Sequence, residues 1–169
     1  MKPKPSNIRL ANMEDLTSIV DIYNQAVRSR MATGDMDEFK VEERLGWFQK
    51  FDTDNYPLYV VEKEDKVIGY ASISPYRPGR KAMEKVAEIS FFMDYSYHGF
   101  GIGSRLIEYV IANCKRLGKE TLLAILMDIN TPSISLLKKF GFVEWGHFPN
   151  IINFENTKCG HLVYGLKLK

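Results

Sequence analysis

The sequence predicts a single mixed α/β domain, and three observations lead to this fold class. The chain has 169 residues, which is the length of one ordinary domain with a sizeable core. Hydrophobic residues make up 45% of it and charged residues 26%, as in globular proteins generally. Stretches of strand-like composition alternate with stretches of helical spacing along the whole chain, which favours one mixed domain over separate helical and sheet domains.

The first third of the chain predicts one strand and two helices. Ile8 and Leu10 alternate in a short strand, and Asn12 is a suitable N-cap ahead of two acidic residues. The helix that follows runs to about Arg28, and an aperiodic loop leads to a second helix over residues 41–50. The apolar face of the first helix comprises Leu16, Ile19, Val20, Tyr23 and Val27.

The middle third predicts three strands and one helix. Strands over residues 58–62 and 67–74 flank the charged turn "KEDK" and form a hairpin. A third strand, over residues 85–94, is rich in β-favouring residues. Helical spacing resumes at Ile102 and stops at Gly118, where a glycine just after the last helical turn is typical.

The last third predicts a strand, a helix and two further strands. The segment "TLLAILMD", residues 121–128, is apolar almost throughout, so we expect it to be buried on both faces of the sheet. A helix follows from about Asn130 to Gly141. Strands over residues 143–151 and 161–168 complete the order β-α-α-β-β-β-α-β-α-β-β.

Charge and composition exclude several partners. With 23 Lys and Arg against 21 Asp and Glu, the net charge of +2 offers no basic surface for nucleic acid. No signal-type or membrane-spanning apolar stretch occurs, so we expect a cytoplasmic protein without a membrane partner, with residues 1–6 as a flexible N-terminus. Cys114 and Cys159 have no metal-ligand spacing, and we expect no metal.

A glycine-rich turn between a strand and a helix indicates an anion site. The segment "HGFGIG" places three glycines at every second position directly before helical spacing begins. Unpaired N–H groups and the positive end of the helix dipole meet at such a point, where a phosphate binds. The spacing excludes the dinucleotide fingerprint, because Gly99 and Gly101 are followed by Ser104 in place of its last glycine, and no Walker A motif is present.

This turn resembles the (Arg/Gln)-x-x-Gly-x-(Gly/Ala) motif of the GNAT superfamily of N-acetyltransferases. The segments "IRLANMEDLTSIVDIYNQAV", "YASISPYRP", "AEISFFMD" and "NTPSISLLKKFGF" and the element order resemble its phosphinothricin N-acetyltransferase branch from residue 7 onward. The resemblance implies the GNAT fold in a single domain, residues 7–169: a mixed, mostly antiparallel sheet, splayed at the cofactor cleft and flanked by helices. It also implies acetyl-CoA as co-substrate and a homodimer.

The resemblance also implies which residues bind acetyl-CoA. The strand splays near Phe92 and Met93, so that free backbone amides face the thioester and the pantetheine arm. Asn130 and Ser133 match the family's "N-x-x-S", with the amide of Asn130 on pantetheine; for Ser133 a helix cap is the alternative. Backbone amides of the turn hold the pyrophosphate, from His98, Gly99, Phe100, Gly101, Ile102, Gly103 and Ser104. His98 replaces the usual Arg or Gln and could equally be a solvated side chain.

Glu88 is the candidate general base. It is a carboxylate within an otherwise apolar strand, where partial burial raises the pKa toward the range of a useful base. It matches the family's proposed base, although an exposed strand carboxylate is the alternative. Relatives carry Tyr or His as an acid for the thiolate where this chain has Leu136 and Leu137. Water or another residue such as Tyr164 could supply that proton.

Two arginines on the loop "SPYRPGR" are candidate substrate ligands. Arg77 and Arg80 offer the guanidinium fork that an α-carboxylate needs, or are simply solvated. The resemblance implies transfer to the primary amine of an amino acid or analogue, such as phosphinothricin or methionine sulfone and sulfoximine. Two alternatives remain open: transfer to a polyamine, an aminoglycoside or a protein N-terminus, and a CoA-binding domain without turnover.

Overall fold

A computed structural model describes residues 7–168, so the expected flexible segment 1–6 lies outside the described residues. Within these described residues, the strands form one seven-stranded sheet in the order β1-β2-β3-β4-β5-β7-β6. Among the described strands, only β4 and β5 pair in parallel, and the other pairs are antiparallel. The strands are β1 (Asn7–Leu10), β2 (Leu58–Lys63), β3 (Lys66–Pro75), β4 (Val86–Met93), β5 (Thr121–Met127), β6 (Val143–Phe154) and β7 (Thr157–Lys167). The predicted mixed, mostly antiparallel sheet is confirmed.

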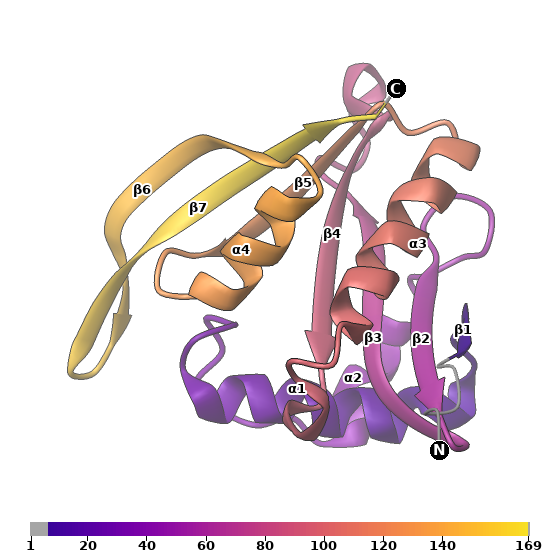
Figure 1. The fold of residues 1–169 in the computed structure, drawn as a ribbon, viewed down its shortest axis with the longest axis horizontal. Helices are drawn as coiled ribbons and strands as arrows, with labels where there is room; N and C mark the ends of the chain where they lie inside the picture. The colour runs from indigo at the N-terminus through magenta and orange to yellow at the C-terminus, as the bar shows by residue number, and fades with distance from the viewer. Residues whose placement is uncertain (1–6, 169) are drawn as a thin grey trace.

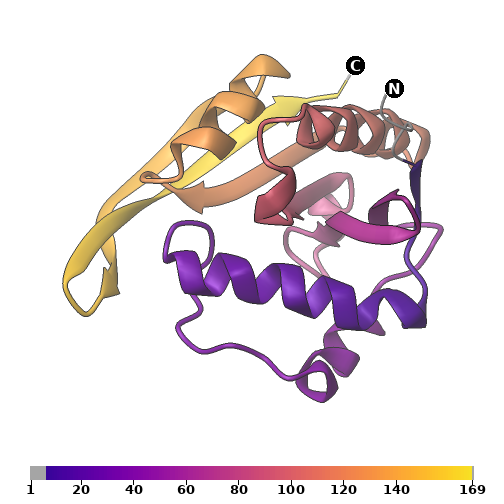
Figure 2. The same ribbon diagram turned by 60° about the horizontal axis from the view of Figure 1, so that its bottom comes forward.

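In the described part of the chain, four α-helices cover the two faces of the sheet (Figure 2). Helices α1 (Leu16–Ser29) and α2 (Val41–Phe48) lie on one face, and α3 (Ile102–Arg116) and α4 (Thr131–Lys139) lie on the other. Asn12, the expected N-cap, accepts the N–H of Glu14 at 2.9 Å and starts a short 3-10 turn that leads into α1. Over residues 7–168, no helix combines the length and hydrophobicity needed to cross a bilayer.

Each face of the sheet has its own hydrophobic core. The larger core lies between the sheet and α3 and α4, and α3 contributes Leu106, Ile107 and Val110, which have no exposed surface. The second lies beneath α1 and α2. The predicted apolar face of α1 is buried throughout. The expected burial of β5 on both faces is also found, since all its residues are buried except the half-buried Ile125.

The sheet opens between β4 and β5, as expected for this fold. The two strands pair only from Val86 with Thr121 to Ile89 with Ala124. Beyond that point β4 continues to Met93 without a partner on this side, and the two strands diverge toward α1 (Figure 1). The backbone groups of β4 that face the opening therefore make no hydrogen bonds to a neighbouring strand.

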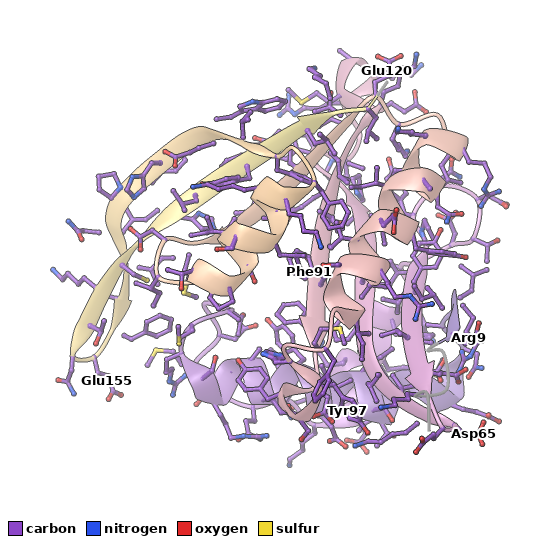
Figure 3. All side chains as sticks on the ribbon, in the orientation of Figure 1. Arg9, Asp65, Phe91, Tyr97, Glu120 and Glu155 are labelled. Carbon is purple, nitrogen blue, oxygen red and sulfur yellow. The ribbon has the colours of Figure 1, made fainter. Side chains whose placement is uncertain are left out.

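The C-terminal hairpin is longer than the sequence suggested. The segment 152–160, expected to connect two separate strands, itself belongs to β6 and β7 except for a turn at Glu155 and Asn156. Glu155 marks the tip of the hairpin in Figure 3. The expected bounds were wrong because the polar run "NFENTK" lacks strand alternation; Phe154 and Cys159 are nevertheless buried with Met127, which holds the two strands together to their ends.

Candidate active site

The glycine turn shapes the N-terminus of α3. Gly99 and Gly101 have φ angles of +82° and +75°, a conformation that favours glycine. Gly101 is the N-cap, and a Cβ built on either glycine would meet no atom within 4 Å. The turn thus presents bare backbone to open space ahead of a 15-residue helix, which is the geometry of an anion site.

A cavity of about 450 Å³ extends from this turn along β4 to the start of α4. Phe91 on β4 and Tyr97 beyond its end, both labelled in Figure 3, form part of its wall. Ten of the residues predicted to bind cofactor line it: Phe92, Met93, His98, Gly99, Gly101, Ile102, Gly103, Ser104, Asn130 and Ser133. The eleventh, Phe100, is 73% exposed and is not among the lining residues.

Two side chains that line the glycine-turn cavity make hydrogen bonds within the protein. Asn130 caps α4, because its Oδ1 accepts the N–H of Ser133 at 3.3 Å. The capping role raised for Ser133 therefore belongs to Asn130, and the amide NH₂ of Asn130 makes no hydrogen bond to a described residue. His98 lies with Nε2 3.1 Å from the carbonyl oxygen of Met93 and packs against Tyr95.

A basic side chain that the sequence analysis missed lies beside the turn. Lys139, at the end of α4, donates to Ser104 Oγ at 3.2 Å. It brings positive charge to the first turn of α3, next to the glycine turn in which His98 stands at the motif position of Arg or Gln. Nothing in the sequence signals this contact, since the two residues are 35 positions apart.

A second cavity, of about 630 Å³, contains Glu88. Glu88 pairs with Ser74 on β3 and Leu123 on β5, one residue before the two strands separate. Its face of the sheet is the one covered by α1 and α2, and aromatic side chains from both helices and from β3 and β4 surround the cavity. These are Tyr23, Trp47, Tyr70 and Phe92.

Burial raises the pKa of the Glu88 carboxyl above its ordinary value. The side chain is half-buried, and among residues 7–168 no group forms an ion pair or hydrogen bond with its carboxylate. Desolvation without a compensating cation favours the protonated form. The carboxyl group is therefore poised to take up a proton nearer neutral pH than an ordinary glutamate.

The free-energy cost of ionising the half-buried Glu88 carboxyl predicts a pH-dependent effect on stability. Below the ordinary pKa of 4.5, Glu88 is protonated in both folded and unfolded chains, so Glu88→Gln should leave the melting temperature unchanged. As the pH rises through the raised folded pKa, wild type must ionise a half-buried group and loses stability, whereas the variant does not. We expect the variant to melt at a higher temperature than wild type at pH 7 and at the same temperature near pH 4, by circular dichroism. A variant that is less stable at pH 7 would contradict this.

The two cavities share Phe92 and Ala32 on their walls. Phe92 packs edge-on against Tyr23, with ring centroids 5.0 Å apart, and tilted against Tyr70 at 5.4 Å. The cavity at the glycine turn and the cavity at Glu88 therefore meet at the opening between β4 and β5.

The predicted substrate arginines do not lie on either wall. Arg77 and Arg80 follow β3 and are both exposed, and neither lines the cavities at Glu88 or the glycine turn. An arginine that does line the Glu88 cavity is Arg44 on α2. Arg44 escaped prediction from the sequence because it looks like one more charge on a partly exposed helix.

The thiolate acid has no candidate at the expected position. Leu136 lines the glycine-turn cavity and Leu137 is buried in the core. Tyr164, the alternative donor, is 2% exposed within the larger core and lines neither cavity.

These features define a class of protein. The described sheet opens between the parallel strands β4 and β5, bare glycine backbone caps the helix beside the opening, and the half-buried carboxyl of Glu88 lies at its inner end. This arrangement fits the pyrophosphate and pantetheine arm of a CoA thioester, with open space where a Cβ at Gly99 or Gly101 would project. The class is the CoA-dependent N-acetyltransferases.

The chain belongs to the acetyltransferase (GNAT) family, whose family model matches residues 17–142. YwnH of Bacillus subtilis, provisionally named a phosphinothricin acetyltransferase, is 36% identical over 162 residues, covering 95% of this chain and 98% of that protein. An L-methionine sulfoximine/L-methionine sulfone acetyltransferase of Salmonella typhimurium is 29% identical over 85% of this chain and 84% of its own.

A solved relative binds acetyl-CoA. The GNAT superfamily phosphinothricin acetyltransferase of Sinorhizobium meliloti, crystallised in complex with acetyl-CoA, aligns with a TM-score of 0.90 at 27% identity. The alignment covers 96% of this chain and 88% of that one. The protein is thus an N-acetyltransferase with the GNAT fold, as the glycine turn and element order predicted.

Proposed function

We propose that the protein transfers the acetyl group of acetyl-CoA to the primary amine of an amino acid or amino-acid analogue, with Glu88 as the general base. The observation that carries this proposal is the position of Glu88: an unpaired carboxyl with a raised pKa lines a cavity that meets the glycine-turn cavity at Phe92. The acceptors named for the relatives, phosphinothricin and the methionine sulfoximine and sulfone pair, support the acceptor class.

Acetyl-CoA supplies the activated acetyl group when bound, and the chain supplies binding and proton transfer. We propose that backbone N–H groups of residues 98–104 hold the pyrophosphate, and that Phe92, Met93, Asn130 and Ser133 contact pantetheine. Glu88 accepts a proton from the acceptor ammonium, directly or through one water, and leaves a neutral amine. No residue is assigned as acid for the thiolate, so we propose water. Direct transfer needs no metal.

A thiol-release assay tests this function. The protein is incubated with acetyl-CoA and one amine at a time, and free CoA is measured. We expect release with phosphinothricin, L-methionine sulfone and L-methionine sulfoximine, and little with polyamines, aminoglycosides or peptides. Release with polyamines alone would overturn the acceptor class. Calorimetric binding of acetyl-CoA without release for any amine would identify a binding domain without turnover.

We further propose that residues 7–169 act as one domain and that two chains form a homodimer in the cytoplasm. Apolar side chains exposed on the edge strand β6 support association, because edge strands with such residues tend to find partners; they are Val143, Trp145, Phe148 and Ile151. Two free, buried cysteines support a reducing compartment. Light scattering that gives the mass of one chain at micromolar concentration would contradict the dimer.

A further inference from the structure

Arg44 is held among aromatic rings in the wall of the Glu88 cavity. It lies one turn before Trp47 on α2, so the two side chains share a side of the helix. Its guanidinium carbon lies 4.2 Å from the ring centroid of Trp47, 4.9 Å from that of Tyr23 and 5.0 Å from that of Phe39. Cation–π attraction to three rings fixes the charge in place.

The rings leave the hydrogen-bonding capacity of Arg44 unused. A guanidinium has five N–H donors, yet among residues 7–168 no oxygen accepts a hydrogen bond from Arg44 and no carboxylate forms an ion pair with it. Burial raises the pKa of Tyr23 to about 12, so this neighbouring phenol stays neutral and does not offset the charge. A half-buried cation with free donors is suited to an anion from outside the chain.

The loop before α2 is also held in place around this cavity. Tyr23 Oη lies 2.6 Å from Thr33 Oγ1 and also donates to Asp35. Asn24 binds Phe39 twice, accepting its N–H and donating to its carbonyl oxygen, both at 2.9 Å. Asn24 on α1 therefore fixes Phe39, one of the rings around Arg44, and so helps to hold the cation in a defined position before any ligand arrives.

The two charged side chains on this wall have opposite signs and remain apart. Arg44 and Glu88 both line the cavity, and they form no ion pair with each other. An amino acid has the complementary pattern, an amine and a carboxylate separated by one carbon. Its amine at Glu88 would leave the carboxylate free to meet a separate cation.

We infer that Arg44 binds the carboxylate of the acceptor and so selects amines that carry one. The inference rests on the proposed function for the identity of the ligand, and it replaces Arg77 and Arg80, which lie off the cavity wall, in this role. Arg44 acts as a specificity-determining residue, and it contributes through a bidentate contact that a lysine ammonium reproduces only in part.

The test compares an acid with its own amide. Binding of L-methionine sulfone and of its α-amide is measured by calorimetry on wild type, Arg44→Gln and Arg44→Lys, each saturated with CoA. We expect Arg44→Gln to raise the Kd of the acid about 10- to 100-fold, the scale of a charge-assisted hydrogen bond, and to leave that of the amide unchanged. Arg44→Lys should recover part of the loss. Phosphinothricin, which carries a second acidic group, is measured in the same way to show whether Arg44 contacts that group instead of the carboxylate.

Control variants separate this role from others. Lys50→Gln removes the same charge from an exposed position just beyond α2 and should have no effect on either ligand. Equal losses for acid and amide, an unchanged Kd in Arg44→Gln, a loss seen in Arg77→Gln instead, or wild type that binds none of these acids would each overturn the inference. Wild type that binds the acid but releases no CoA would refute the proposed function and leave the role of Arg44 intact.

Discussion

Glu88→Gln is expected to lower kcat about 10²- to 10⁴-fold near neutral pH, the usual contribution of a positioned general base. Glutamine keeps the shape of the side chain and loses the proton acceptor. Acetyl-CoA should bind as before, because Glu88 lies outside the glycine-turn cavity. Steady-state kinetics and calorimetry measure the two effects separately.

The pH dependence of kcat/KM distinguishes a general base from a side chain that only lines the cavity. In wild type, kcat/KM should fall as the pH drops through the raised pKa of Glu88, because the protonated carboxyl accepts no proton. The Glu88→Gln variant should not show this fall in kcat/KM. Its loss of turnover should become smaller at high pH, because the amine is then already neutral when it binds. Glu84→Gln, an exposed carboxylate just before β4, is the matched control and should behave as wild type. Normal turnover of Glu88→Gln at pH 7 would remove Glu88 from the mechanism.

Gly101→Val is expected to raise the apparent acetyl-CoA constant about 10- to 100-fold, the loss of one charge-assisted hydrogen bond or more. Gly101 has a φ of +75°, which a β-branched residue strongly disfavours. The turn must therefore change shape, and its backbone donors move away from the pyrophosphate. His98→Ala should have only a mild effect, because the donors proposed here are backbone N–H groups. Titration of acetyl-CoA by calorimetry compares the variants.

Gly118→Val is the control for this experiment. Gly118 has a φ of +72° just after the far end of α3, with no atom within 4 Å of a built Cβ. It imposes the same backbone strain on the same helix without touching the cavity. The glycine turn would be supported as the phosphate site if both variants lose similar stability and only Gly101→Val raises the acetyl-CoA constant. An unchanged acetyl-CoA constant in a folded Gly101→Val protein would show that the phosphate site lies elsewhere.

Local sequence patterns were sufficient for most of the fold. The hairpin of β2 and β3 was predicted from its charged turn, where Glu64 and Asp65 both adopt positive φ angles. Gly118 and Gly141 mark helix ends, as expected. The ends of β6 and β7 escaped prediction because their pairing depends on the burial of Phe154 and Cys159 against Met127, a contact between segments far apart in sequence.

Some residues of the candidate site could likewise be predicted from local sequence, and others could not. The residues of the glycine turn and the neighbouring strand are contiguous in the chain, so a motif could identify them. Arg44 reaches the Glu88 cavity only because α2 packs across the sheet, and Lys139 reaches Ser104 only because α4 lies beside α3. Arg77 and Arg80 show the converse: their place on the loop after β3 suggested substrate ligands, but within one chain neither lines the Glu88 cavity. Comparison of Arg77→Gln with Arg44→Gln decides between the loop and α2 as the carboxylate site.

Phe92 has a thermodynamic consequence that neither cavity has alone. Its ring lines both cavities and packs on Tyr23 and Tyr70 in the cavity that contains Glu88. A cofactor that shifts this ring changes the affinity for the acceptor, and linkage requires the acceptor to change the affinity for the cofactor by the same factor. Each apparent binding constant is then a function of the other reactant's concentration, and no single pair of numbers describes the protein.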